Sequence, residues 1–116
     1  MAASHITLYH NPKCGTSRSV LALIREAGFE PEIVEYMTYP VTRSALARIA
    51  MRMPAHDMLR TKEPLAQELG LVHPGTPDGD ILDAIATNPV LLNRPIVETP
   101  KGARACRPAE LVKDLL

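Results

Sequence analysis

The 116-residue sequence has no tryptophan, one phenylalanine and three tyrosines. Bases of single-stranded nucleic acids stack on aromatic side chains, which this chain hardly supplies. An excess of positive charge is missing as well, because 13 lysines and arginines balance 13 aspartates and glutamates. A nucleic-acid surface needs a basic excess or stripe. We therefore expect no nucleic-acid partner, although the balance still allows a local cluster of arginines.

Long apolar runs are also missing, and none approaches the roughly 20 residues of a membrane span. The first ten residues, MAASHITLYH, lack the charged region, apolar stretch and cleavage site of a secretory signal. The length suits a single domain, 1–116, that buries a core without disulfides. We expect a cytoplasmic protein with no membrane contact.

Cysteine is scarce, with Cys14 and Cys106 at opposite ends of the chain. Neither belongs to a metal-ligand spacing, so we expect no metal site and no structural disulfide. A disulfide between the two cysteines is the less favoured alternative.

The first third of the chain has the pattern of a βαβ unit. Residues 5–9 alternate apolar and polar side chains, which indicates a strand. A helical pattern runs from Thr16 to a stop at Gly28, and residues 32–36 form a second strand. Such a crossover makes the two strands parallel.

The remaining pattern predicts a block of helices followed by a ββα half. Thr42 is the expected N-cap of a second helix, and Pro108 is placed in the first turn of the last one. The order indicates an α/β fold in which a four-stranded mixed sheet is flanked by helices, with a helical insertion between the two halves. The other expected elements are a helix that Pro54 ends, short helical pieces in 55–71 broken by Pro64 and Gly70, a helix over 78–88, and a hairpin over 94–106.

Cys14 lies in the loop between the first strand and the first helix. Ligands gather at the carboxyl end of such a strand, and the helix N-terminus favours an anion. A thiolate is such an anion, so we expect the pKa of Cys14 to lie below its ordinary value of about 8.5. Gly15 would let a backbone approach closely, and His10 or Lys13 would add positive charge. The alternative is a buried structural cysteine, which the polar loop disfavours.

Ser17 completes a C-x-x-S pattern with Cys14, and this frame cannot close an internal disulfide. An oxidised intermediate must then be resolved by an outside thiol or by Cys106. His10, at the end of a strand, is also compatible with a purely hydrogen-bonding role.

The stretch YHNPKCGTSR, together with LRTKEP and LNRPIVETPKGARACRPAE, resembles the arsenate reductase family linked to glutathione and glutaredoxin. The resemblance runs from Ile6 to the final helix. It implies a thioredoxin-like fold, a nucleophilic Cys14 and, at Pro95, the cis-proline that precedes the third strand. The oxyanion-binding residues that it implies are Arg60, Arg94 and Arg107, and the residues that support the thiolate are His10, Asn11, Gly15, Thr16 and Ser17.

The resemblance further implies the reduction of arsenate to arsenite through a covalent cysteinyl–arsenate intermediate on Cys14. Glutathione is the implied co-substrate, glutaredoxin the partner, and no metal or bound cofactor is needed. We expect a monomer. The compact segment TKEP is closer to a housekeeping branch of the family, so arsenic resistance as the cellular role stays open.

Simpler interpretations exist for each residue and for the whole chain. Arg60 would cap a short helix, Arg94 would sit in a loop, and Arg107 would pair with Glu110. Cys106 is favoured as a core residue over a redox-sensitive thiol.

A monothiol glutaredoxin-like oxidoreductase is one rival function, but it gives the three arginines no task. An Spx-like regulator that binds RNA polymerase is the other, and Ser17 breaks the C-x-x-C switch that many such regulators use.

Overall fold

The computed structural model describes residues 5–116. The chain divides into two compact units. The first contains residues 5–39 and 94–116, and the second contains Pro40–Asn93. The second unit is thus inserted in the sequence between the βαβ half and the ββα half of the first, as the pattern of elements predicted.

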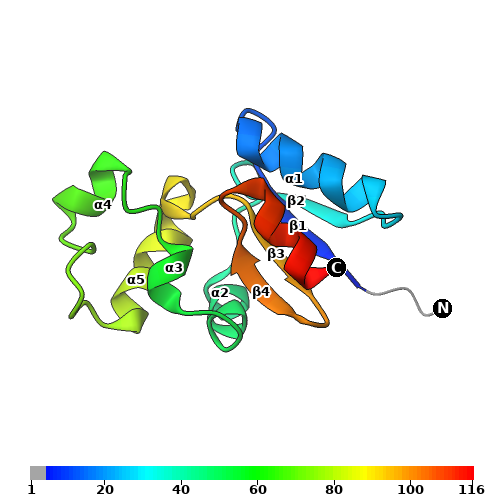
Figure 1. Ribbon diagram of the computed structural model, residues 1–116. Helices are drawn as coiled ribbons and strands as arrows, with labels where there is room; N and C mark the ends of the chain where they lie inside the picture. The colour runs from blue at the N-terminus through cyan, green and yellow to red at the C-terminus, as the bar shows by residue number, and fades with distance from the viewer. Residues whose placement is uncertain (1–4) are drawn as a thin grey trace. The chain divides into compact units, whose positions relative to one another are not determined.

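The first unit is built on a four-stranded sheet with the order β2-β1-β3-β4 (Figure 1). β1 and β2 are parallel, while β3 runs antiparallel to both β1 and β4. The predicted mixed sheet and the parallel βαβ unit are therefore confirmed. The strands are β1 Thr7–His10, β2 Glu32–Glu35, β3 Ile96–Thr99 and β4 Gly102–Ala105.

Two helical segments, α1 (Gly15–Glu26) and η2 (Ala109–Leu115), lie side by side against the sheet (Figure 1). The element predicted as a last helix is a 3-10 helix, and Pro108 is its N-cap rather than a residue of its first turn. Burial of the apolar side chains of these segments stabilises the folded chain by about 25 cal/mol for each Å² of apolar surface that is removed from water. The core that the two segments share with the sheet consists of Ile6, Leu8, Val20, Ile24, Val97, Cys106, Ala109, Val112 and Leu115.

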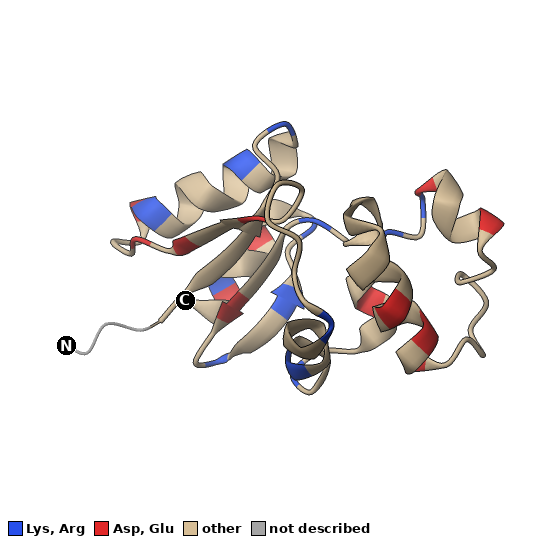
Figure 2. Ribbon diagram, turned by 180° about the vertical axis from the view of Figure 1, so that it is seen from behind, with Lys and Arg blue, Asp and Glu red and all other residues tan. Residues whose placement is uncertain are grey.

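The sequence of α1 explains its orientation on the sheet. Val20 and Ile24, one turn apart, are fully buried, whereas the charged residues lie on the exposed face (Figure 2). After the helix, Gly28 adopts a φ of 94°, a conformation that costs other residues energy. Gly28 therefore defines the C-terminal end of α1. The N-terminus of α1 lies near the carboxyl end of β1, because only residues 11–14 separate the two elements.

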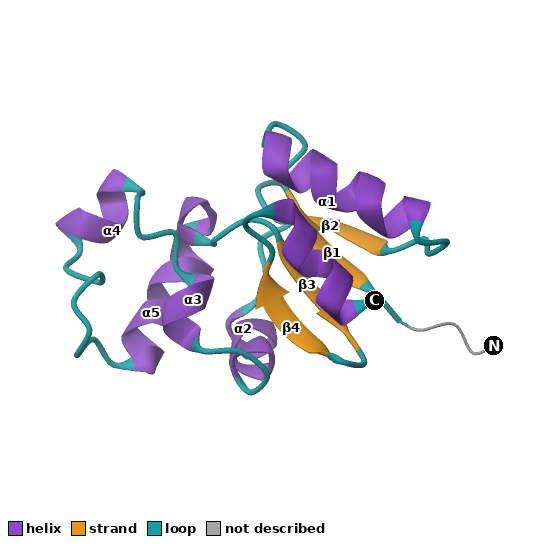
Figure 3. Cartoon of the chain, in the orientation of Figure 1, coloured by secondary structure: helices purple, strands orange, loops and turns teal. Residues whose placement is uncertain are grey.

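The second unit consists of short helices without a strand among its described residues (Figure 3). Thr42 caps α2 as predicted, because its Oγ1 accepts the Ala45 N–H at 3.2 Å. Pro64 was expected to break a helix, but it is the first residue of α4, where its missing N–H costs no hydrogen bond. α5 packs against α2, α3 and η1. The elements are α2 Arg43–Ala50, α3 Ala55–Met58, α4 Pro64–Glu68, α5 Asp78–Thr87 and η1 Pro89–Leu91.

Within residues 5–116, no helix is both long enough and apolar enough to cross a membrane.

Candidate active site

Cys14 is the N-cap residue of α1, four residues after the end of β1. Its N–H donates to the Asn11 carbonyl at 2.9 Å, and its own carbonyl accepts the Arg18 N–H at 3.0 Å. These two bonds close a tight loop and start the helix. The side chain is partly exposed, so the sulfur stands at the positive end of a 12-residue helix where a reagent can reach it.

Opposing effects set the pKa of the Cys14 thiol. Burial alone would raise it, but the Ser17 N–H, the Arg94 guanidinium and the Thr16 N–H together outweigh the burial and hold the pKa below its ordinary value. The two backbone donors belong to the first turn of α1, whose N–H groups have no partner inside the helix. The lowering of the pKa agrees with the prediction, and two of the predicted supporting residues, Thr16 and Ser17, contribute through their backbone N–H groups.

Ser17 uses its hydroxyl elsewhere. Its Oγ lies 2.6 Å from His10 Nδ1 and accepts the Asn11 N–H at 3.1 Å. His10 and Ser17 are both buried. Ser17 therefore hydrogen-bonds the Cys14 thiol through its backbone N–H. Its hydroxyl connects the end of β1 to the first turn of the helix.

The expectation that His10 would add positive charge is wrong. Burial holds its pKa below the ordinary value, Arg18 and Arg25 lower it further, and Glu35 only partly offsets them. The imidazole is accordingly neutral near pH 7. Its hydrogen bond to the Ser17 hydroxyl connects the end of β1 to the first turn of α1, and any action of His10 on the thiol remains a prediction.

Two arginines that flank the β3–β4 hairpin complete this part of the site. Arg94 precedes Pro95 across a cis peptide bond, and its side chain hydrogen-bonds Cys14. Arg107, which precedes a second cis proline, places Nη1 3.8 Å from Cys14 Sγ and 3.1 Å from the Arg94 carbonyl oxygen. Among residues 5–116, Arg107 thus hydrogen-bonds Cys14 and Arg94, and not Glu110 as in the simpler interpretation. Cys14 and two of the three predicted arginines come together within the first unit.

Arg60 lies in the second unit. Its Nη1 donates to Glu63 Oε2 at 2.7 Å, and both side chains are partly buried. Glu63 is the N-cap residue of α4. This bond joins two side chains and does not cap the helix, and any role of Arg60 toward the thiol remains a prediction.

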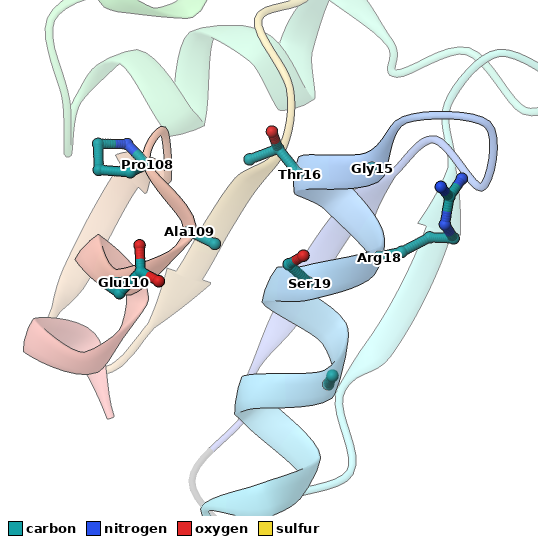
Figure 4. Close-up of a pocket in the computed structure, with 8 residues that line it drawn as sticks. Gly15, Thr16, Arg18, Ser19, Pro108, Ala109 and Glu110 are labelled. Atoms are coloured by element: carbon teal, nitrogen blue, oxygen red, sulfur yellow. The ribbon is translucent and has the colours of Figure 1, made fainter.

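An open groove of about 690 Å³ lies between the first turns of α1 and the start of η2 (Figure 4), and Cys14 is not among the residues that line it. Thr16 and Ser19 line one wall, and Glu110 lies on the other (Figure 4).

A Cβ on Gly15 would meet only Arg18 Nη2, at an ordinary contact distance of 3.7 Å. The local backbone therefore does not require glycine at Gly15.

Cys106 is completely buried in the core of the first unit, and the pKa of its thiol is raised to about 12 by that burial, which Arg104 offsets only in part. Both cysteines are free thiols. The disulfide alternative is thus wrong, and the favoured interpretation of Cys106 as a core residue is confirmed.

Sequence reasoning missed Tyr36. The residue follows the last residue of β2, and its side chain is 1% exposed. Asn11, Arg94 and Cys14 all influence the pKa of its hydroxyl, which burial raises. A signal was present in the sequence, because the carboxyl ends of two parallel neighbouring strands meet at one edge of the sheet.

Within residues 5–116, no group of three or more His, Cys, Asp and Glu side chains is arranged to hold a metal ion.

Residues 9–115 match the model of the ArsC family. The chain belongs to the ArsC family. It is 46% identical over 113 residues to an arsenate reductase of Rhizobium meliloti, covering 96% of this chain and 81% of that protein. It is 44% identical to the Escherichia coli K12 arsenate reductase, over 97% of this chain and 82% of that protein.

A solved structure of an arsenate reductase from Vibrio cholerae superposes on this ArsC-family chain with a TM-score of 0.90 and 35% identity, covering 98% of this chain and 99% of that one. The thioredoxin-like fold and the family resemblance are thereby confirmed. The family match includes every site residue named from the sequence, from His10 to Arg107.

Proposed function

We propose that this chain reduces arsenate to arsenite, with Cys14 as the nucleophile and with glutathione and glutaredoxin as the source of electrons. The observation that carries the proposal is a partly exposed thiol of lowered pKa that is hydrogen-bonded by Arg94 and contacted by Arg107. The arsenate reductase names of the relatives agree with this chemistry.

The arginines answer an electrostatic problem. Arsenate and a thiolate are both anions near neutral pH, and two unit charges 4 Å apart repel by about 4 kcal/mol at an effective dielectric constant of 20. Guanidinium groups relieve this repulsion and offer paired donors that fit a tetrahedral oxyanion. Arg94 and Arg107 are assigned to the arsenate oxygens on this ground. Arg60 is assigned to the adduct and its reduced product on the family motif.

The reaction begins with attack by the Cys14 thiolate on arsenic. A sulfur–arsenic bond forms, and one arsenate oxygen leaves as hydroxide, which becomes water after protonation. The glutathione thiolate then attacks arsenic, and a second oxygen leaves as hydroxide, which becomes water after protonation. The glutaredoxin thiolate attacks the glutathione sulfur, so that the bond between this sulfur and arsenic breaks, a glutathione–glutaredoxin disulfide forms, and arsenic(V) is reduced to arsenic(III). Water then displaces the Cys14 sulfur from arsenic, which releases arsenite and restores the thiolate.

Both thiols that are oxidised must come from outside the chain. Ser17 stands where a C-x-x-C site has its resolving cysteine, and Cys106 is buried with a pKa of about 12. A soluble thiol such as glutathione is the reductant that this arrangement needs, and the cytoplasm is the compartment that keeps it reduced. We propose that the chain acts there as a monomer, without a bound cofactor.

The test compares Cys14→Ser with the matched variant Cys106→Ala. Arsenite formation in the presence of glutathione and glutaredoxin is expected to vanish in the first and to persist in the second. Reduction of hydroxyethyl disulfide by the wild-type chain serves as a parallel assay for glutaredoxin-like activity. Full arsenite formation by Cys14→Ser, or rapid disulfide reduction without arsenate reduction, would overturn the proposal.

A further inference from the structure

Tyr36 lies at the carboxyl edge of the sheet, where the site is built. Because His10 pairs with Glu35 in the parallel register of β1 and β2, the next residues along the two strands, Asn11 and Tyr36, leave the sheet together. The Tyr36 side chain is 1% exposed. Within residues 5–116, no group makes a hydrogen bond of good geometry with its hydroxyl. A buried hydroxyl without a partner is uncommon, because it loses its bonds to water on folding.

The neighbours of this hydroxyl explain which bond is missing. Arg94 has only N–H groups and accepts no hydrogen bond. Asn11 Oδ1 is engaged by the Lys13 N–H at 3.0 Å, and the NH₂ group of Asn11 is again a donor. Arg94 and Asn11 therefore both offer donors to the phenol oxygen, while the phenol proton is bonded to no acceptor among the described residues. An oxygen that carries negative charge would supply the acceptor.

Resting on the function proposed above, we propose that Tyr36 is a substrate-contacting residue whose hydroxyl donates a hydrogen bond to an oxygen of the tetrahedral oxyanion held at Cys14 and Arg94. The bond forms only when the anion is present. The Tyr36 hydroxyl would then make its hydrogen bond in the occupied site only, whereas the guanidinium groups contact Cys14 in the empty site as well.

The groups that lower the pKa of the Cys14 thiol are Ser17, Arg94 and Thr16. Tyr36 is not one of them. We therefore expect Tyr36 to act on the anion and to leave the reactivity of the free thiol unchanged.

The three tyrosines of the chain form a natural set of variants. Tyr9 is buried, and its hydroxyl donates to Glu98 Oε1 at 2.8 Å; Tyr39 is 71% exposed. Each is changed to phenylalanine in the full chain, which removes one hydroxyl and keeps the ring. Three quantities are measured for every variant: the Tm without anion, the dissociation constant of sulfate from the sulfate-dependent rise in Tm, and the KM for arsenate. Sulfate is an unreactive tetrahedral probe.

Tyr36→Phe is expected to keep or raise the Tm of the free chain, because it removes a buried hydroxyl without a partner. It is also expected to weaken sulfate binding and to raise the KM for arsenate, each roughly tenfold, since a bond to a charged acceptor is lost. Tyr9→Phe is expected to lower the Tm by about 3–6 °C with little change in sulfate affinity. Tyr39→Phe is expected to change neither quantity. The pH profile of Cys14 alkylation without anion should match the wild type in Tyr36→Phe.

A Tyr36→Phe variant that loses stability as Tyr9→Phe does and binds sulfate as the wild type does would overturn the proposal and leave the reductase function standing. Failure of sulfate and arsenate to stabilise the wild-type chain would overturn both. A wild-type chain that binds sulfate through Tyr36 but forms no arsenite would refute the proposed reaction alone.

Discussion

The two cysteines of the first unit have the same side chain in opposite surroundings. Cys14 stands at a helix N-terminus, partly exposed, and its pKa is held low because backbone N–H groups and Arg94 outweigh burial. Cys106 follows β4, is completely buried, and has a pKa raised to about 12. Its sulfur has the Arg104 carbonyl at 3.7 Å as its polar neighbour, an acceptor that favours the protonated thiol.

The difference shows that an arginine nearby does not by itself make a cysteine reactive. Arg104 lowers the pKa of Cys106, as Arg94 lowers that of Cys14, yet burial dominates at Cys106. What Cys14 has in addition is the first turn of α1, whose free N–H groups point at the sulfur. Reactivity therefore follows from the element that carries the cysteine as much as from the neighbouring charge.

The largest expected difference between Cys14 and Cys106 is in the rate at which each thiol is alkylated. At pH 7 a thiol with a pKa of about 12 is ionised to about one part in 100,000, and Cys106 is in addition inaccessible. Cys14 should react with iodoacetamide with a midpoint below about 8.5, while Cys106 stays unmodified in the folded chain. The rate at each cysteine as a function of pH is followed by mass spectrometry of the peptides.

The urea-unfolded chain is the control, because both thiols should then react alike. Equal rates in the folded chain, or a Cys14 midpoint at or above the ordinary value, would contradict the assigned environments.

The next effect concerns the two arginines. Arg94→Gln is expected to raise the pKa of Cys14, because a hydrogen bond and a positive charge next to the thiolate are lost. It should also lower kcat/KM for arsenate by about 100-fold or more, which is typical for the loss of one donor to a transition-state anion. Steady-state kinetics and the alkylation profile of Cys14 measure the two effects.

Arg104→Gln is the matched control. This arginine lies beside the other cysteine and pairs with Asp114 at the surface, so the pKa of Cys14 and the kinetics should both stay unchanged. Similar losses in the two variants would mean that Arg94 acts through the general charge of the unit and not at the thiol.

Much of the fold was predictable because its signals are local. Strand alternation, the Gly28 stop and the Thr42 cap each depend on a few neighbouring residues, and the βαβ order then determines a parallel pair. The helix N-terminus at Cys14 was predictable for the same reason. Pro64 was misjudged because a proline that breaks a helix and a proline that begins one look alike until the residues before it are placed.

The parts of the site that sequence reasoning missed depend on burial and on distant segments. His10 was expected to be charged, but its pKa depends on the chain packed around it. Tyr36 was assigned to a strand by its periodicity. The sequence pattern could not show that its hydroxyl lies near Arg94, a residue that precedes β3 and is distant in the sequence. A residue at the end of a strand therefore needs the topology before its role can be judged.

A smaller effect is expected for the stability of the core. Cys106→Ala removes one fully buried sulfur from the cluster that packs Val112 and Leu115, which should lower the free energy of unfolding by about 1 kcal/mol. Cys14→Ala removes a partly exposed side chain and should change that free energy little. Urea denaturation of both variants tests the contrast; a larger loss in Cys14→Ala would show that its thiol stabilises the fold.

The smallest expected effect is the pH dependence that His10 contributes. Its pKa is lowered in the folded chain by burial, so the unfolded chain, with an ordinary value of about 6.5, binds a proton more readily. Stability linked to His10 is therefore fully present above about pH 6.5 and is lost as the pH falls through the lower, folded pKa.

Urea midpoints between pH 7.5 and 5 should fall more steeply in the wild type than in His10→Gln, whatever the absolute stability of the variant. His73→Gln, a change at an exposed histidine, should keep the wild-type slope. If His10→Gln and the wild type had equal slopes, the pKa of His10 would be the same in the folded and the unfolded chain, and the lowering of this pKa by burial would be wrong.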